Sequence, residues 1–384
     1  MSKQRLGDYI EEYSVKNKND EEYPVYSVTN KQGFCTEYFN KDVSGADKTK
    51  YKIVPFGYFA YNPSRINVGS VDWQSCEENV IVSPLYVVFK CKNGLTQDYL
   101  KYFLKSSYGL RLINSSVSGS VRNNLKFRTL SEFVLNIGDS REQQRIVNDL
   151  DKIKNAIDIE QRQIDLYDEL VKARFVEMFG LFPSNEKGWE VGTIRDLVTE
   201  VRYGSSRKAA EGNNGKYPYL RMNNITYSGE LDLSDTKTID VPDDELEKCT
   251  VRRGDLLFNR TNSKELVGKT CVYNRDDAMV LAGFVIRVRL NERALPEFVS
   301  AFLNTDFSKT MLLGMCKEAI GQANINAQEF QNIAIYIPPI SLQKDFIEFK
   351  EQVDKSKVVI QKRIDLYTEL LNKKMDEFFN PEVS

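Results

Sequence analysis

A segment near the middle of the chain is repeated at its carboxyl end. Residues 163–179, QIDLYDELVKARFVEMF, match residues 363–379, RIDLYTELLNKKMDEFF, at an offset of 200 residues without a gap. The match extends weakly back to Gln143 and Gln343. Because self-similarity at a fixed offset is the mark of a repeated architecture, and this offset is about half of 384 residues, the sequence predicts a duplicated fold.

A second, fainter similarity joins the starts of the two halves. RLGDYIEEYSVKNK, from Arg5, resembles TIRDLVTEVRYGSS, from Thr193. The predicted order along the chain is therefore domain, helix, domain, helix.

Both copies of the strong repeat have the pattern of long helices. Apolar residues recur at steps of three and four, which is the spacing of a coiled-coil seam, and neither segment has an internal Pro or Gly. Each helix is expected to run for about 35 residues, or about 50 Å at 1.5 Å per residue. We expect the two helices to pack on each other as an antiparallel coiled coil; the alternative is that each packs only on its own domain. The residues chosen for this seam are Ile153, Ile157, Ile164, Tyr167, Val353, Ile360, Ile364 and Tyr367.

Helix-ending residues divide the chain into four segments. Gly180 and Pro183 follow the first helix, Pro338 and Pro339 precede the second, and Asp139 with Ser140 suits a helix start. The predicted segments are a first domain at 1–139, a central helix at 140–180, a second domain at 181–338 and a C-terminal helix at 339–384.

The two domains have the composition of mixed α/β folds, so the chain as a whole is expected to be α+β. Runs rich in Val, Ile, Tyr and Phe predict strands, and each domain also has one helical stretch, at 95–113 and 295–315. The predicted strand runs are 23–28, 78–91 and 133–137 in the first domain, and 217–222, 254–260, 270–274 and 284–290 in the second.

Polar loops recur at parallel places in both domains. Arg and Asn side chains suit the base edges of guanine and adenine, and Ser, Thr and backbone N–H groups suit phosphates. The alternative is that Asn, Gly and Ser merely form turns. The candidate DNA-binding residues are Tyr61, Asn62, Ser64, Arg65, Ser120, Arg122 and Asn123 in the first domain, and Tyr203, Ser205, Ser206, Arg207, Arg221, Asn223, Asn259, Arg260, Thr261, Gln322 and Asn324 in the second.

Composition and motifs argue against catalysis by this chain. There is no His, which excludes His-based triads, general bases and metal ligands. An Asn/Asp-Pro-Pro-aromatic loop, an FxGxG loop and a GxxxxGK[ST] loop are all missing. The net charge of −2 argues mildly against nucleic acid unless basic residues are gathered in one groove. We therefore predict no catalytic residue, no metal and no cofactor in this chain.

The remaining features indicate a cytoplasmic protein. No run of about 18 apolar residues is present, and the first residues lack the apolar core of a secretory signal. The six cysteines are scattered without CxxC pairs, which fits a reduced compartment.

The pattern resembles the specificity (S) subunit of Type I restriction-modification enzymes, over essentially the whole chain. The resemblance is carried by the paired IDLY-E-L helices, by EQQRI at 142–146 and by PPISLQK at 338–344. Phrases inside the domains, such as YNPSR from Tyr61 and RRGDLLFNR from Arg252, are also similar to this family. The first copy has Gly138 and Asp139 where the second has two prolines, a departure that affects only how the chain enters the helix.

The resemblance implies a division of labour. Each target-recognition domain would read one half of a split, asymmetric site on double-stranded DNA. The helices would act as a spacer and as the dock for two DNA adenine methyltransferase subunits, which would bind S-adenosylmethionine. A motor-nuclease subunit using ATP and Mg would be a further partner.

Other function classes remain open on the sequence alone. The chain could be the specificity subunit of another methyltransferase-based defence system. It could be a coiled-coil scaffold that binds protein, which predicts no salt-dependent affinity for DNA. A self-sufficient methyltransferase or nuclease would need the motifs that are missing.

Overall fold

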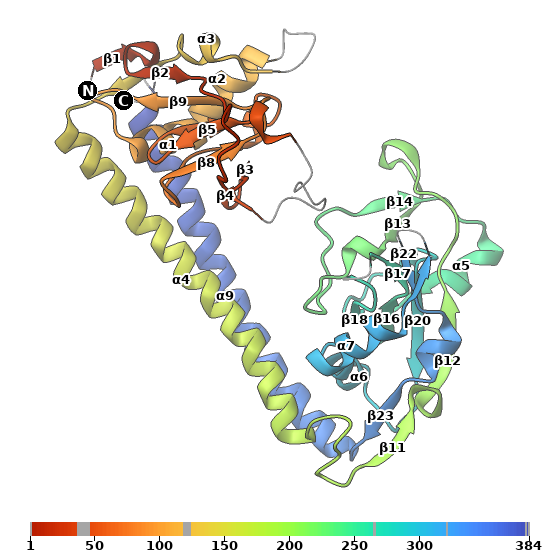
Figure 1. The fold of residues 1–384 in the computed structure, drawn as a ribbon. Coiled ribbons are helices and arrows are strands. Elements are labelled where there is room, and N and C mark those ends of the chain that lie inside the picture. Colours follow the sequence, from red (N-terminus) through yellow and green to blue (C-terminus); the bar gives the residue numbers. More distant parts are fainter. Residues whose placement is uncertain are drawn as a thin grey trace. The chain divides into compact units, whose positions relative to one another are not determined.

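The computed structural model describes residues 2–36, 47–117, 124–263, 266–319, 322–380 and 382 (Figure 1). The chain divides into two compact units. Unit 1 is Met1–Gln161 together with Gln361–Ser384, and unit 2 is Arg162–Ile360. The division falls inside the two long helices, so each unit contains a stretch of both, and each is described by itself.

The long helices are α4 (Ser140–Phe179) and α9 (Ile340–Phe379). Each has 40 residues, or about 60 Å at 1.5 Å per residue. They exceed the expected 35 residues because the segments around Gln143 and Gln343 are already helical. At the start of α4 the side chain of Asp139 accepts a hydrogen bond from the backbone N–H of Glu142 at 2.8 Å, which satisfies one of the free N–H groups of the first turn.

In unit 2 the two helices run antiparallel. Lys357 of α9 pairs with Asp168 of α4 at 2.6 Å, and the ring of Phe346 lies 5.3 Å from that of Phe175. From Asp168 to Phe175, toward the carboxyl end of α4, the partner on α9 changes from Lys357 to Phe346, toward the amino end of α9. The expected antiparallel packing of the helices is therefore confirmed in this unit.

In unit 1 the amino-terminal part of α4 packs on the carboxyl-terminal part of α9. Glu160, which interrupts the apolar pattern of α4, is nearly buried and pairs with Arg363 of α9 at 2.7 Å. Further along, Leu150 of α4 and Met375 of α9 share one apolar core. The ion pair with Arg363 thus offsets the cost of placing the Glu160 carboxylate within the apolar face of α4. Of the residues chosen for the seam, Val353, Ile360 and Ile364 are buried, and Ile153, Ile157, Ile164, Tyr167 and Tyr367 are half-buried.

Unit 1 contains a four-stranded antiparallel sheet in the order β2-β9-β6-β7, with the pairs β1-β10, β5-β8 and β3-β4 beside it. Its apolar core lies between this sheet, the helices α1 and α2, and the ends of α4 and α9. The strands are β1 (Ser2–Arg5), β2 (Ile10–Tyr13), β3 (Ser27–Thr29), β4 (Gly33–Cys35), β5 (Lys52–Pro55), β6 (Phe59–Tyr61), β7 (Val71–Trp73), β8 (Asn79–Val82), β9 (Val87–Cys91) and β10 (Val134–Ile137), and the helices are α1 (Gln97–Lys105), α2 (Ser107–Val117) and α3 (Phe127–Leu130).

Unit 2 contains an equivalent sheet in the order β12-β20-β16-β18, together with β14-β13-β19-β15, β17-β22-β21 and the pair β11-β23. The strands are β11 (Glu190–Thr193), β12 (Val198–Tyr203), β13 (Tyr217–Leu220), β14 (Lys237–Ile239), β15 (Thr250–Val251), β16 (Leu256–Asn259), β17 (Thr261–Asn262), β18 (Thr270–Val272), β19 (Met279–Leu281), β20 (Val285–Leu290), β21 (Lys317–Ala319), β22 (Gln322–Asn324) and β23 (Ala334–Ile337), and the helices are α5 (Asp243–Cys249), α6 (Pro296–Leu303), α7 (Asp306–Met315) and α8 (Ala327–Gln331).

The two units share one order of elements, which confirms the duplication. In each, a short 3-10 turn near the start is tied to the residue directly before the last strand, β10 or β23: Leu6 N–H donates to Phe133 O at 2.8 Å, and Ile194 N–H donates to Ile333 O at 2.9 Å. These pairs are offset by 188 residues at the start of the unit and by 200 at its end. The faint similarity of the two starts therefore reflects the same structure.

Three predicted runs are divided in the structure; one is the helical run 295–315, which breaks into α6 and α7 at Asn304 and Thr305. The strand run 78–91 breaks into β8 and β9 at Ser83 and Pro84, because proline has no N–H for a ladder bond. The helical run 95–113 breaks into α1 and α2 at Ser106, whose buried hydroxyl donates to Phe103 O at 2.7 Å.

A buried glutamine in the first turn of each long helix fixes the loop before α1 or α6. Gln143 accepts from Thr96 N–H at 2.9 Å and donates to two backbone carbonyls, of Gly94 and Gly138. Gln343 accepts from Leu295 N–H at 2.8 Å and donates to the corresponding carbonyls of Arg293 and Pro338. The weak extension of the repeat back to these glutamines thus has a structural cause.

Candidate nucleic-acid interface

In unit 1 the structure brings two predicted polar loops together. The backbone N–H of Leu125 donates to the carbonyl of Pro63 at 3.1 Å, and the hydroxyl of Ser64 donates to the amide oxygen of Asn124 at 2.8 Å. The segment after β6 therefore lies against the segment before α3. The candidates Ser120, Arg122 and Asn123 lie outside the described residues.

Tyr61 corrects one prediction. It is the last residue of β6, it is 0% exposed, and its hydroxyl donates to Leu125 O at 3.2 Å. Burial raises the pKa of its hydroxyl. Because this side chain lies in the core against Phe89, it shapes the joined loops and does not present a surface to DNA.

The other described candidates of unit 1 lie on the joined loops. Ser64 and Arg65 are exposed, and Asn62 is half-buried. The amide oxygen of Asn62 accepts from the backbone N–H of Ser64 at 3.0 Å, and its carbonyl accepts from Arg65 N–H at 2.9 Å. Asn62 therefore builds the turn from which Ser64 and Arg65 project.

Unit 2 has the same joint. The N–H of Ile325, before α8, donates to the carbonyl of Arg260, after β16, at 2.9 Å. This bond corresponds to the one from Leu125 to Pro63, because β6 and β16 hold equivalent places in their sheets. We name this feature, the backbone bond together with its two loops, the loop joint.

Two candidates of unit 2 meet at the loop joint. The guanidinium of Arg260 lies 4.9 Å from the ring centroid of Tyr203, at a cation–π distance. The hydroxyl of Tyr203 accepts from the backbone N–H of Ala327 at 3.0 Å. Tyr203 is exposed and Arg260 is half-buried, so an exposed ring lies beside the guanidinium.

Three further candidates are corrected because they are buried. Asn259 is 0% exposed, and its amide lies 3.0 Å from both the carbonyl of Thr261 and the amide of Asn262. Thr261 is also buried, and its hydroxyl donates to the side chain of Asn324 at 3.2 Å. The buried hydroxyl of Ser205 accepts from Arg207 N–H at 3.3 Å. These side chains satisfy loop backbone and neighbours, so they support the surface instead of forming it.

Two arginines predicted to bind DNA are already paired with carboxylates. Arg207 forms a bidentate pair with Glu245, at 2.8 and 3.2 Å, and Arg221 pairs with Asp235 at 2.9 Å. Hydrogen bonding from Arg221 holds the pKa of Asp235 below its usual range. Either arginine would have to exchange its carboxylate for a base or a phosphate.

The remaining candidates of unit 2 surround these residues. Ser206 and Asn223 are exposed, and the amide of Asn223 donates to Asp235 at 3.3 Å. Asn324 is half-buried. The backbone of Gln322 belongs to β22, next to β17.

Residues 281–284, which the sequence reasoning missed, connect the loops of unit 2. Ser205 N–H donates to Leu281 O at 2.7 Å, Ala282 N–H donates to Leu220 O at 2.9 Å, and Arg260 N–H donates to Phe284 O at 3.0 Å. Phe284 is 53% exposed beside Arg260. Its only sequence signal is the Ala-Gly-Phe phrase that separates two apolar strands.

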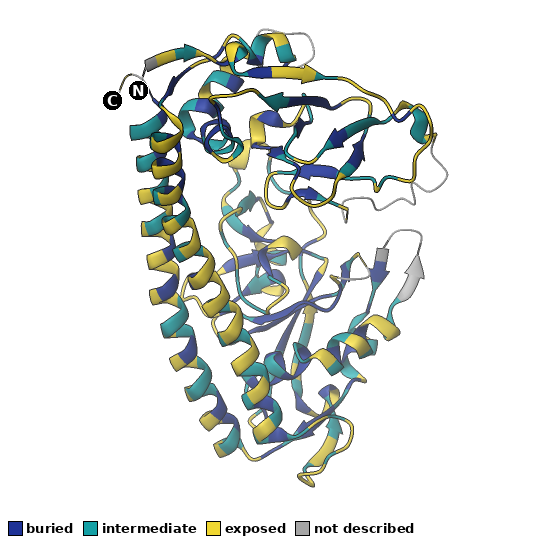
Figure 2. Cartoon of the chain, turned by 60° about the vertical axis from the view of Figure 1, so that its left-hand side comes forward, coloured by how far each residue is buried: buried dark blue, intermediate teal, exposed yellow. Residues whose placement is uncertain are grey.

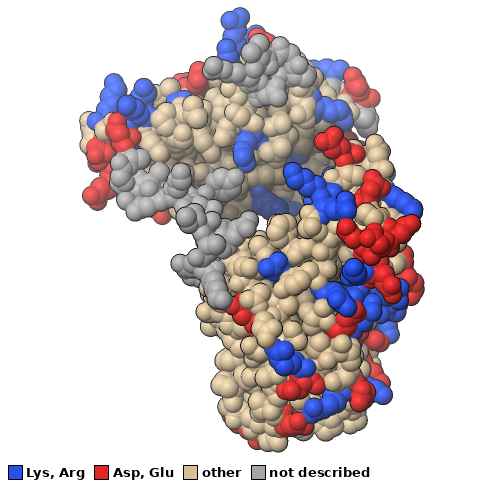
Figure 3. Space-filling view, turned by 90° about the vertical axis from the view of Figure 1, so that its right-hand side faces the viewer, with Lys and Arg blue, Asp and Glu red and all other residues tan. Residues whose placement is uncertain are grey.

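Charge is not gathered into one continuous patch on the face seen in Figure 3. Lysine and arginine side chains there alternate with aspartate and glutamate, and neutral residues cover much of the surface. A net charge of −2 fits this distribution.

The described part of the chain contains neither a candidate metal site nor a candidate membrane-spanning helix. No three His, Cys, Asp or Glu residues there are placed to hold a metal ion. None of the described helices is both long enough and apolar enough to cross a membrane.

The architecture defines a class: a duplicated α+β protein whose two halves alternate with two long helices. One solved structure, described as showing complex assembly and conformational transition of the type I R-M system, shares this fold with a TM-score of 0.56 and 14% identity, covering 98% of this chain and 96% of that one. The family model "Type I restriction modification DNA specificity domain" matches twice, at residues 7–166 and 186–367. The chain belongs to this family.

Curated relatives agree with this assignment. The Type I restriction enzyme EcoKI specificity subunit of Escherichia coli K12 is 24% identical over 282 residues, which is 70% of this chain and 60% of the relative. The StySPI specificity subunit of Salmonella potsdam is 22% identical over 287 residues, which is 71% of this chain and 61% of the relative. The chain thus spans about 60% of the length of these relatives.

Proposed function

We propose that this chain reads a split, asymmetric DNA site, with one half-site read at the loop joint of each unit. The observation that carries the proposal is the same backbone bond at equivalent places in both units, Leu125 to Pro63 and Ile325 to Arg260. Membership of the specificity-domain family supports it. Different side chains surround the two joints, so each is suited to a different half-site.

The chemistry at each loop joint suits a duplex. In unit 2, Arg260 can bond the O6 and N7 of guanine, and Asn324 can bond the N6 and N7 of adenine. In unit 1, Arg65 and Ser64 are exposed beside the loops and suit a base edge and a phosphate. We propose that Tyr203 acts through its ring, by holding the guanidinium of Arg260.

Selection from a random duplex library tests this proposal. The full chain is mixed with the library at several salt concentrations, and the bound fraction is sequenced. We expect two conserved half-sites separated by unconserved positions, with affinity that falls steeply as salt rises. Binding without base preference, or with affinity independent of salt, would favour the protein-binding scaffold.

We further propose that α4 and α9 set the spacing between the half-sites. Readers on one side of a duplex lie about one helical turn apart, or about 34–36 Å. Each helix is about 60 Å long, which is enough to set such a spacing.

Exposed apolar residues on these helices support docking of two copies of one partner. Leu166 of α4 is 67% exposed, and Leu366 of α9, 200 residues later, is 62% exposed. Leu170 and Leu370 repeat the pattern, and yellow exposed residues follow both helices in Figure 2. Isolated exposed leucines are ordinary, but a duplicated set on two helices is typical of an interaction surface. One set belongs to unit 2 and the other to unit 1.

The partner proposed for these surfaces is a DNA adenine methyltransferase that uses S-adenosylmethionine. A motor-nuclease that uses ATP and Mg would complete a restriction complex. We propose that this chain contributes recognition and the partners contribute catalysis. The methyltransferase of another defence system is the alternative partner, and copurification would identify it.

Charged substitutions test the docking surfaces. Leu166→Asp and Leu366→Asp should each remove one methyltransferase copy from the complex, and the double variant should remove both, as measured by native mass spectrometry. Gln161→Asp and Gln361→Asp are matched controls, because their exposed side chains lie about 140° around the helix from the leucines. Loss of both copies from a single variant would contradict two independent docks.

A further inference from the structure

Residues 221–235 of unit 2 form an arch whose first residues include the candidate reading residues Arg221 and Asn223. Arg221 at one foot pairs with Asp235 at the other at 2.9 Å. The amide of Asn223 also donates to Asp235, at 3.3 Å. Asn224, which is buried, donates to the carbonyls of Asp232 and Asp235 at 2.8 and 3.2 Å. The feet are therefore tied together, and Asp232 N–H donates to Asn224 O at 2.8 Å, so a continuous set of bonds joins Arg221 and Asn223 to the arms of the arch.

The tip of the arch is a tight turn that packs on α6. Thr226 N–H donates to Glu230 O, and Glu230 N–H donates to the hydroxyl of Thr226, both at 2.9 Å. Gly229 has φ +87°, and a Cβ there would come within 2.3 Å of the side chain of Asn304, at the end of α6. Glycine thus allows the turn to lie directly on the helix.

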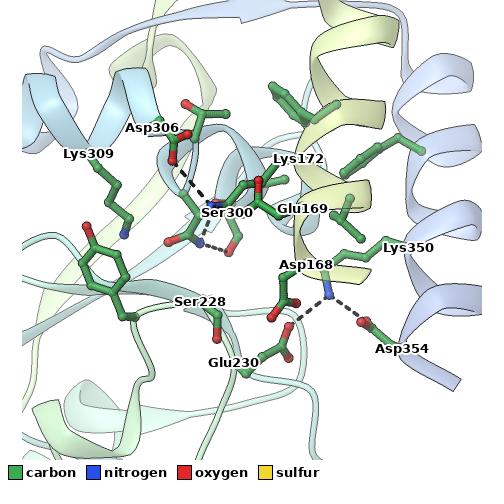
Figure 4. Close-up of a pocket in the computed structure, with 18 of the residues that line it drawn as sticks. Asp168, Glu169, Lys172, Ser228, Glu230, Ser300, Asp306, Lys309, Lys350 and Asp354 are labelled. Carbon is green, nitrogen blue, oxygen red and sulfur yellow. Dashed lines mark hydrogen bonds and ion pairs between the residues drawn. The ribbon is translucent and has the colours of Figure 1, made fainter. Parts of the chain in front are cut away.

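A lysine of the long helix α9 holds the tip. Lys350 reaches Glu230 at 3.4 Å and Asp354, one turn along its own helix, at 2.6 Å (Figure 4). Burial disfavours the charged form of Lys350, but the two carboxylates outweigh it and hold its pKa above the usual range. A second cation, Lys309 of α7, lies 5.0 Å from the ring centroid of Tyr227.

The ion pair between Lys350 and Glu230 is important because open space lies beneath the tip. A cavity of about 290 Å³ lies between the arch, α4, the α6–α7 region and α9, and Tyr227, Gly229 and Glu230 line it (Figure 4). The tip therefore packs on the end of α6 on one side and borders this cavity on another. Without the ion pair between Lys350 and Glu230, the open space gives the turn room to change position.

The equivalent position of unit 1 holds a leucine instead of a lysine. The residue 200 positions before Lys350 is Leu150, which is fully buried in the core of unit 1. An apolar side chain is thus sufficient for helix packing at this position of the repeat. The charge at Lys350 is therefore not required for helix packing, and its contact outside α9 is Glu230 of the arch.

We propose that Lys350 is a positioning residue for the second recognition domain: through Glu230 it fixes the arch and so places Arg221 and Asn223 for base reading. This inference rests on the proposed function. It makes a residue of the long helix, and not only the loops, a determinant of which bases are read.

Library selection with the full chain tests the inference. The variants are Lys350→Leu, which installs the residue found at the equivalent place in unit 1, Lys350→Arg, which keeps the charge, and Arg221→Ala, which marks the positions read by the arch. We expect Lys350→Leu to weaken base preference by about tenfold at the positions that Arg221→Ala alters, which is the range of one base contact. The other half-site should keep its preferences, and Lys350→Arg should retain both.

A further variant separates reading from folding. Lys350→Leu combined with Glu230→Gln removes the unpaired carboxylate and should still read poorly, with a melting temperature close to that of the wild type. Unchanged preferences in Lys350→Leu would overturn the inference, and so would equal losses at both half-sites or a Lys350→Arg variant as impaired as Lys350→Leu. A wild-type chain that selects no bases would instead refute the proposed function.

Discussion

The buried glutamine at the start of each long helix should control the stability of its own unit. Gln343 is 0% exposed and makes three hydrogen bonds to backbone groups, the N–H of Leu295 and the carbonyls of Arg293 and Pro338, at 2.8 to 3.1 Å. Gln343→Leu keeps a similar side-chain volume but leaves these groups without partners. Each unpaired buried group costs about 1–3 kcal/mol. Allowing for partial access of water, we expect unit 2 to lose about 2–4 kcal/mol.

Gln143→Leu should have the same effect on unit 1. Its partners are Thr96, Gly94 and Gly138, at 2.7 to 2.9 Å. Gln144→Leu is the matched control, because Gln144 is exposed and bonds only to the side chain of Asn148 among the described contacts.

Amide hydrogen exchange measures each unit separately, which a single melting curve of a two-unit chain does not. A loss of 2–4 kcal/mol corresponds to about 30- to 1000-fold faster exchange of the core amides. We expect this acceleration in α6 for Gln343→Leu and in α1 for Gln143→Leu. A change below threefold would refute the expected free-energy cost of leaving these backbone groups without partners. Equal acceleration of both units by one variant would refute their independence.

Three further predictions concern reading, pH and spacing. Arg260→Ala should cost about 1–3 kcal/mol of base discrimination in one half-site only, as measured by library selection; equal loss in both half-sites would contradict independent domains. Burial, aided by Lys269 and Lys172, lowers the pKa of Lys309 to about 8. The unfolded chain therefore binds more protons between pH 8 and 10.5, so the stability of unit 2 should rise with pH across this window. Lys309→Met should abolish the rise and add roughly 2–3 kcal/mol at pH 7, as measured by hydrogen exchange or by denaturant titration. Deleting one heptad from both α4 and α9 removes about 10 Å of helix. The unread gap between the half-sites should then shorten by about three base pairs, while the bases read stay the same. Sequencing of bound or methylated sites would measure the gap, and an unchanged gap would contradict the spacer role.

The sequence predicted the helices well because their signal is local and repeated. The IDLY-E-L copies gave the offset of 200 residues, and apolar residues at steps of three and four gave the packing face. Glu160 looked like an interruption because its partner, Arg363, lies 203 residues away. A pattern along one helix does not contain the charge of the neighbouring helix.

Composition predicted where the polar loops lie. It did not distinguish the exposed side chains of a loop from the buried side chains that support it. Tyr61 and Tyr203 were both chosen as contacts, yet Tyr61 is fully buried and Tyr203 is exposed. Tyr61 ends a strand between two others, β7 and β9, whereas Tyr203 ends β12, at the edge of its sheet. This difference depends on which strands pair, and that is set by contacts between distant residues.

Residues 281–284 escaped prediction for another reason. Their bonds to Ser205, Leu220 and Arg260 use backbone N–H and carbonyl groups, which every residue except proline possesses in the same form. Nothing in the side chains of this segment marks it as a connector.

Under the proposed function, the same fact explains how two similar units would read different bases. The bond that closes each loop joint uses only the carbonyl of Pro63 or Arg260 and the N–H of Leu125 or Ile325. Proline keeps its carbonyl although it lacks an N–H, so this bond tolerates either residue. The side chain at this position can therefore change without opening the joint, and under the proposed function only the group presented to DNA changes with it. Pro63→Arg should accordingly leave unit 1 folded while it alters the bases selected by that half.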